Sequence, residues 1–142
     1  MLEDLENRCN AIEECYEFML AYAAQGLAGD AGSTSGSQLR EFLRRAVNAL
    51  SGLAGSYTEA VAQQDLQPAG KYQAFLAVLD RDAADALAAV ELVVAQPALS
   101  SQLIDNLNAS VHLRSLLTDL FLIDEIIKLQ RISSNASKLE EV

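Results

Sequence analysis

The chain has 142 residues, of which 51% are hydrophobic and 21% charged, and a formal net charge of −10. This length fits one domain, and so large an apolar share excludes an intrinsically disordered chain. The acidic balance argues against nucleic acid as the main partner, because an acidic surface repels the phosphate backbone.

The first predicted element is a helix over residues 2–25. Its apolar residues recur at alternating intervals of three and four, which is the heptad pattern of a helix that packs along one seam. Asp4 and Arg8 are four residues apart, so we expect them to pair on the exposed side. Gly26 is the expected C-terminal stop, and the Gly- and Ser-rich segment 26–37 predicts a surface loop.

The second predicted helix covers residues 38–64, with Ser37 as its N-cap. Apolar residues again follow one another at intervals of four and three. Gly52 and Gly55 interrupt this helix, and each weakens it by roughly 1 kcal/mol relative to Ala. Either the two glycines allow a close crossing with another helix, or they mark a bend.

The third and fourth predicted helices cover residues 69–95 and 102–131. The charged run 80–82 is a point at which the third helix could divide into two. Ser100 or Ser101 is expected to cap the fourth helix. No segment alternates with a period of two over a convincing length, so the sequence predicts no strand.

These elements predict an all-α fold. Four long amphipathic helices with short connections are typical of an antiparallel four-helix bundle, with room for an additional short helix. We expect a single helical-bundle domain over residues 1–131 and a polar, frayed C-terminal tail over residues 132–142.

The fourth predicted helix has more apolar residues than one buried face requires. At 100° per residue, they fall in three arcs rather than one. Either the helix is covered inside its own subunit, at the bundle centre or by extra short helices, or a second subunit buries one arc. We favour the second explanation, because a regular four-helix bundle has no central helix. The candidate interface residues are Leu122, Ile126, Leu129, Leu117 and Phe121.

The sequence predicts no catalytic site, metal site or cofactor. A di-iron bundle needs Glu-x-x-His pairs, but the single histidine, His112, has Ala109 three residues before it. We interpret His112 as a partly buried histidine that is hydrogen-bonded to a neighbour. The alternative is an enzyme that uses His112 as a general base together with Arg114. A buried Arg114 paired with an acid of another helix would instead fix the bundle register.

The two cysteines fit a reducing compartment. Cys9 is assigned to the core as a small hydrophobic residue, whereas Cys15 is placed nearer the edge. Carboxylates close to Cys15 would keep its thiol protonated and make it a poor nucleophile.

Arg40, Arg44 and Arg45 form a basic cluster at the start of the second predicted helix. Helix N-termini bind anions, so this cluster is a candidate contact for an anion or an acidic partner. The alternative is that the arginines pair with the acidic face of the first helix.

Together these patterns favour a non-enzymatic helical-bundle interaction protein, such as an adaptor, chaperone or assembly factor. Its expected partners are a second copy of the chain, as a homodimer, and another protein. A small-molecule-binding or sensory bundle with an apolar pocket between helices is the main alternative. The sequence shows no signal peptide and no candidate membrane span, so we expect a cytoplasmic protein.

Overall fold

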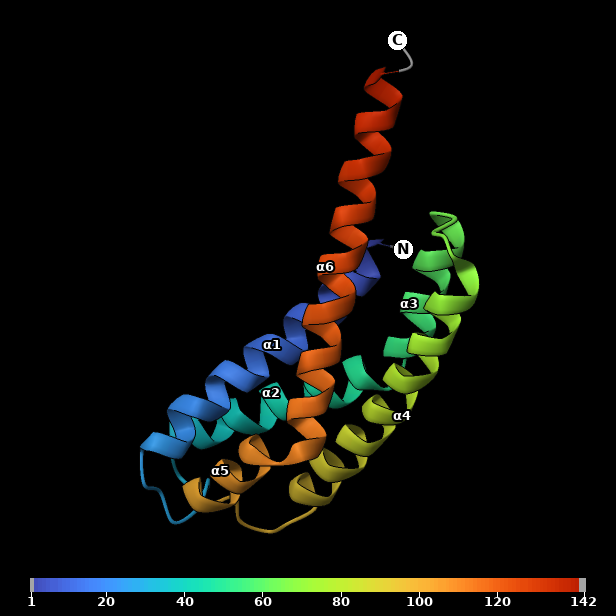
Figure 1. Cartoon of the computed structure of the whole chain (residues 1–142). Helices are drawn as coiled ribbons and strands as arrows, with labels where there is room; N and C mark the ends of the chain where they lie inside the picture. The colour runs from blue at the N-terminus through green and yellow to red at the C-terminus, as the bar shows by residue number, and fades with distance from the viewer. Residues whose placement is uncertain (1, 141–142) are drawn as a thin grey trace.

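The computed structural model describes the backbone of residues 2–140 and the side chains of residues 3–133. Within this part of the chain it contains six α-helices and no strand, which confirms the all-α prediction (Figure 1). The helices are α1 (Leu2–Ala24), α2 (Thr34–Leu50), α3 (Leu53–Gln63), α4 (Ala69–Val94), α5 (Ser101–Ala109) and α6 (Val111–Glu140).

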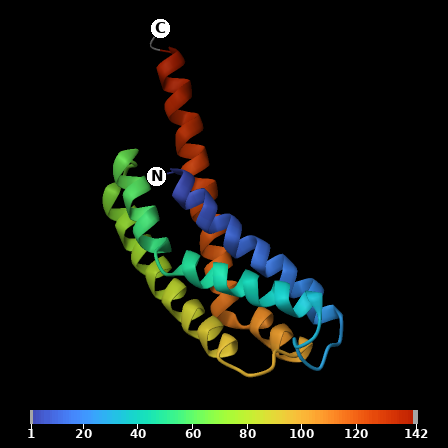
Figure 2. The ribbon, with the colours of Figure 1, turned by 180° about the vertical axis from the view of Figure 1, so that it is seen from behind.

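The helices alternate in direction along the chain. In Figure 1, α1 and α4 run downward, whereas α2 with α3, and α6, run upward. The turned view in Figure 2 shows that the end of α6 projects beyond the other helices. α6 continues to Glu140, through most of the segment 132–142 that was expected to form a tail, and residues 141–142 lie outside the described residues. Fraying of this segment stays a prediction.

The second predicted helix divides into α2 and α3 at Ser51 and Gly52, so the glycine there marks a bend. Arg8 of α1 caps this corner by donating to the carbonyl oxygens of Asn48 and Ala49 at 3.1 and 3.0 Å. Those carbonyls end α2 and lack partners within the helix. A Cβ atom on Gly52 would lie 2.8–2.9 Å from the Arg8 guanidinium, so only glycine fits without displacing the arginine.

The fourth predicted helix also divides, and Ser110 is the cause. Its backbone is extended, and its hydroxyl accepts a hydrogen bond from the Leu113 amide at 3.4 Å, which caps the start of α6. By contrast, α4 passes through the charged run 80–82 without a break. Leu79 and Ala83 on either side of this run are buried, so the buried seam continues through it.

Serine side chains cap the N-termini of α2, α5 and α6, although one prediction names the wrong serine. Ser33 caps α2 and accepts from the Gly36 amide at 2.9 Å, so the prediction of Ser37 is wrong by one helical turn. Ser100 caps α5 and accepts from the Leu103 amide at 3.0 Å, as expected. Gly36 lies in this first turn. Glycine is required there because a Cβ atom would lie 1.9 Å from the backbone oxygen of Asp30.

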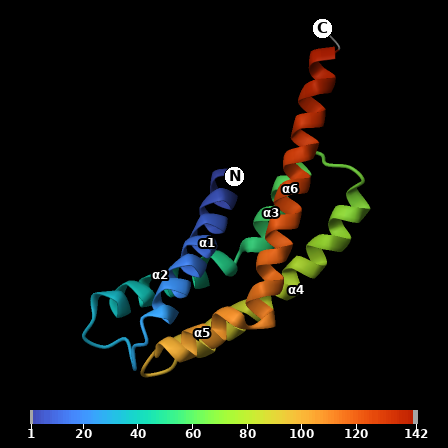
Figure 3. The ribbon, with the colours of Figure 1, turned by 60° about the vertical axis from the view of Figure 1, so that its left-hand side comes forward.

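All six helices contribute to one apolar core. Its largest fully buried side chains are Tyr22, Tyr57, Met19, Leu39, Leu43, Leu53, Leu79, Leu99, Ile104, Leu116, Leu120 and Ile123. Figure 3 shows α4 and α6 running in opposite directions, with their ribbons meeting near the start of α6.

Candidate interaction surface

The exposed side of α6 carries most of the large apolar side chains that the fold leaves in solvent. Of the eight such side chains among the described residues, six belong to α6. Five lie within about three helical turns. Their exposed fractions are 61% for Phe121, 50% for Leu122, 37% for Ile126, 55% for Leu129 and 57% for Ile132. We call these five side chains the α6 apolar face.

Four of the five candidate interface residues lie on this face, and their role as an interface stays a prediction. Phe121, Leu122, Ile126 and Leu129 are exposed, but Leu117 is buried in the core cluster of its own chain. Leu117 lies at the edge of the side of α6 that carries the buried residues Leu120 and Ile123, and Phe121 lies about 40° further round the helix, outside that side. Ile132 joins the face, although it was assigned to the tail.

An apolar groove of about 360 Å³ lies beside this face, between α6 and the start of α4. Pro68, Tyr72 and Phe75 line it from the α4 side, and Leu122 and Ile126 from the α6 side. Sequence reasoning missed the α4 wall, because Tyr72 and Phe75 stand at core positions of the third predicted helix. The groove therefore extends the α6 apolar face onto a second helix.

The Tyr72 hydroxyl near this groove lacks a hydrogen-bond partner. The side chain is 7% exposed, and its Oη atom is fully buried. Burial raises the pKa of the phenol above its usual value. A buried hydroxyl without a partner is costly, so an acceptor reaching it would be stabilising.

Arg40 has its partners within the chain. It forms an ion pair with Asp30 and donates to the carbonyl oxygens of Val94 and Gln96, both at 3.2 Å, which lie at the end of α4. The hydrogen bond from Arg40, assisted by the Leu99 amide, lowers the pKa of Asp30 to about 2. Arg40 thus joins the α1–α2 loop to the end of α4.

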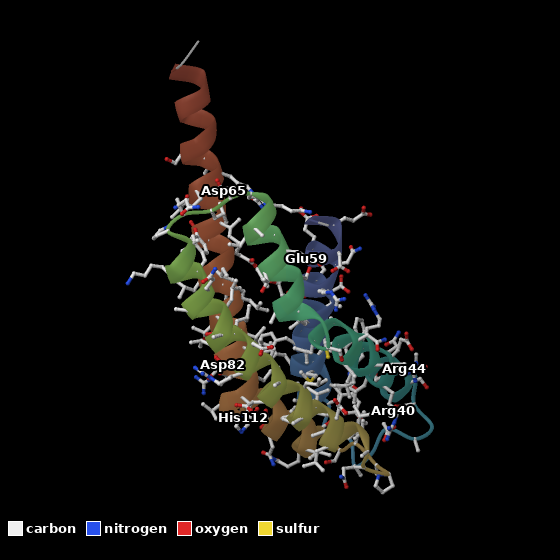
Figure 4. All side chains as sticks on the ribbon, turned by 90° about the vertical axis from the view of Figure 1, so that its right-hand side faces the viewer. Arg40, Arg44, Glu59, Asp65, Asp82 and His112 are labelled. Atoms are coloured by element: carbon white, nitrogen blue, oxygen red, sulfur yellow. The ribbon has the colours of Figure 1, made fainter. Side chains whose placement is uncertain are left out.

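Arg44 and Arg45 are also engaged with carboxylates of their own chain. Arg44 pairs with Glu41 on the exposed side of α2. Arg45 pairs with Glu14 of α1 at 3.0 Å and lies over the Phe42 ring, 5.5 Å from its centroid. Figure 4 shows Arg40 and Arg44 on the same end of the molecule. Arg45 pairs with the acidic face of the first helix, as the alternative predicts, whereas Arg40 pairs with the α1–α2 loop and Arg44 with its own helix. The interpretation as a contact for an anion or acidic partner is not carried forward.

His112 and Arg114 do not form a buried constellation. Both side chains are exposed at the start of α6, so the interpretation of His112 as partly buried is wrong. Exposure of Arg114 equally removes the idea of a buried ion pair that fixes the bundle register. Figure 4 shows His112 on the flank of the molecule that carries Asp82.

A chain of buried polar side chains links α1, α3 and α6. The Tyr57 hydroxyl donates to Asp124 at 2.5 Å and lies 3.2 Å from the Cys9 sulfur. Burial raises the pKa of Cys9 to about 11 and that of the Asp124 carboxyl above its usual range. Tyr57 is fully buried, so this chain satisfies polar groups that would otherwise be unpaired inside the core.

Cys15 is fully packed rather than at the edge of the core, so that placement is wrong. It is 3% exposed, and burial raises the pKa of its thiol to about 12, with a small opposing effect from Arg45. Burial, not neighbouring carboxylates, is therefore what keeps this thiol protonated. Both cysteines are free thiols.

Two carboxyl groups meet between α4 and α6, at Asp82 and Asp119. The Oδ2 atom of Asp119 is buried without a donor, and the facing group is the Asp82 side chain. Burial, together with the hydrogen bond and negative charge of Asp82, raises the pKa of Asp119 to about 7. The pair can share one proton when one carboxyl is protonated. The sequence signal was the charged run 80–82, which we considered only as a break.

The described part of the chain contains no group of three or more His, Cys, Asp or Glu residues arranged to hold a metal ion. Within the same residues, none of the helices has the length and apolar character needed to cross a membrane. Comparison of the chain with protein-family models, with curated proteins and with solved structures finds no match.

Proposed function

We propose that this chain is a non-enzymatic interaction protein, an adaptor, chaperone or assembly factor, which forms a homodimer through the α6 apolar face. In this proposal α2 and α3 act as one rod, and so do α5 and α6. Together with α1 and α4 they make four rods, which form an antiparallel bundle that presents this face. The observation that carries the proposal is the concentration of exposed large hydrophobic side chains on one helix. Isolated exposed apolar residues are ordinary, but a contiguous patch indicates a binding surface.

The size of the face supports this proposal. From the exposed fractions above, five large side chains of about 150–200 Å² each leave roughly 450 Å² of apolar surface in water. A patch of about 300–600 Å² is the largest that a typical monomer exposes, and such patches are often functional. The remaining surface of the chain is rich in carboxylates, which favour solubility and leave this patch as the place for association.

Light scattering coupled to size exclusion tests the homodimer. We expect a mass near twice 15.3 kDa that falls toward the monomer mass on dilution through the micromolar range. A constant monomer mass at the highest concentration would remove the homodimer from the proposal. A dimer that keeps its mass when Phe121, Leu122 and Ile126 are all replaced by Ser would show that another surface mediates association.

A second function, small-molecule binding, is favoured by the α4–α6 groove and the unpartnered Tyr72 hydroxyl. An elongated apolar molecule with a hydrogen-bond acceptor would suit these walls. Native mass spectrometry of the protein as purified tests this alternative. A Tyr72→Phe control should lose any bound mass that depends on the hydroxyl, and a spectrum with the bare chain mass alone contradicts the alternative.

A further inference from the structure

The α6 apolar face consists of two adjoining sectors around the helix. At 100° per residue, Leu122, Ile126 and Leu129 lie within about 60° of one another around the helix. Phe121 is about 100° away from Leu122, and Ile132 is beside Phe121. We call the first three residues the groove sector and the last two the outer sector. Leu122 and Ile126 also line the α4–α6 groove, whereas the outer-sector side chains do not.

The groove sector is continuous with α4, so it offers a concave seat between two helices. Pro68 and Phe75 form the opposite wall. Helices pack at 8–10 Å by placing the ridge of one into the groove of another. An added helix could therefore contact α4 and α6 at the same time. The outer sector offers a convex ridge on a single helix and gives no comparable seat.

Charge separates the two sectors further. Lys71 is the charged residue among the described residues that line the groove, and none of these is a carboxylate. Exposed Glu125 lies between the two sectors, about 20° from Ile132 and about 40° from Leu129, and exposed Lys128 flanks the outer sector. Each copy carries a net charge of −10, so two copies approach with least repulsion where carboxylates are missing from the contact.

The area of the groove sector suits a modest dimer. With its α4 wall it exposes roughly 400 Å² of apolar surface per copy, from side chains of about 150–200 Å² each. About 60% of the area buried in an interface is apolar. An apolar area of roughly 400 Å² therefore corresponds to a total buried area of roughly 650 Å² per partner, at the lower end of specific interfaces. Such an area predicts a concentration-dependent homodimer rather than an obligate one.

Building on the homodimer of the proposed function, we propose that a second copy of this chain seats its α6 helix in the α4–α6 groove, through the groove sector rather than the outer sector. A two-fold arrangement makes the contact reciprocal, because each copy then supplies both a groove and an α6 helix. α4 thereby becomes part of the interface, through Phe75 and Pro68.

Three single variants test the seat by analytical ultracentrifugation. Ile126→Asp places a carboxylate in the groove sector and is expected to raise the dimer dissociation constant at least tenfold. Lys71→Glu adds a carboxylate at the groove rim and is expected to raise the dissociation constant several-fold. Phe121→Asp is the matched control on the same helix, and we expect less than a threefold change. Phe121 is more exposed than Ile126, so exposure alone would predict the opposite order.

The variants also distinguish the location of the interface in the α4–α6 groove from the existence of the homodimer. Lys71 is exposed, so its variant stays informative if Ile126→Asp fails to fold by circular dichroism. If Phe121→Asp dissociates the dimer and Lys71→Glu leaves it intact, the proposal that α6 binds in the α4–α6 groove is wrong. The homodimer of the proposed function then still stands. Equal weakening by all three variants also overturns the seat. A wild-type monomer at every concentration overturns the seat together with the homodimer.

Discussion

The Asp82–Asp119 pair makes the stability of this protein depend on pH in a defined direction. In the unfolded chain Asp119 has the ordinary value of 3.8, whereas in the fold its pKa is raised to about 7. Between these values the folded state binds a proton that the unfolded state does not. The stabilising contribution is therefore complete below about pH 4 and is lost as the pH rises through about 7.

Replacing Asp119 by Asn removes this dependence. The amide has nearly the same shape as the protonated acid and can donate to Asp82 at every pH. A shift from 3.8 to about 7 corresponds to about 4 kcal/mol for a fully buried group. Asp119 is half-buried, and solvent screens the repulsion, so we expect ~1 kcal/mol. For a domain of this size that is an increase in Tm of about 2–4 °C.

Thermal unfolding followed by circular dichroism at pH 5 and pH 8 measures the effect. We expect Asp119→Asn to raise Tm at pH 8, and to raise it by less than half as much at pH 5, where the wild type has lost only part of the contribution. Asp85→Asn is the control, because Asp85 is exposed on α4 and its loss changes the net charge equally. The reasoning is refuted if the two variants shift Tm alike, or if the Asp119→Asn gain is the same at both pH values.

Three further predictions concern the packing of the chain. In urea unfolding, Gly36→Ala should destabilise the fold by about 1–3 kcal/mol, because the new Cβ would overlap the Asp30 carbonyl. Gly55→Ala should stabilise the fold by about 0.5–1 kcal/mol, because its Cβ meets open space. Arg8→Met should cost about 1–2 kcal/mol through the uncapped end of α2, against less than about 0.5 kcal/mol for Arg44→Met at an exposed pair; equal losses would contradict the role of Arg8. At pH 8 the two buried thiols should react with a thiol reagent only on unfolding, since their pKa values are raised to about 11 and 12, and rapid labelling of the native chain would contradict this.

The helical class and the exposed α6 residues follow from periodicity, because the arrangement of apolar residues around a helix is a local property of the sequence. The helix breaks at Gly52 and Ser110 do not follow in the same way. At the Gly52 corner the end of α2 is capped by Arg8, more than forty residues earlier, a contact that local sequence does not indicate. Ser110 becomes a cap because its hydroxyl binds the amide of the next helix, although serine is tolerated inside helices as well.

The α4 wall of the groove shows a more general reason why a binding surface is hard to predict from its sequence. Phe75 and Tyr72 occupy seam positions that are ordinarily buried, and only the position of α6 leaves one side of them open. Leu117 is the opposite case, since its arc predicts exposure and the core covers it. Both outcomes depend on how α6 packs against α4 and the rest of the core, which the periodicity of a single helix does not specify.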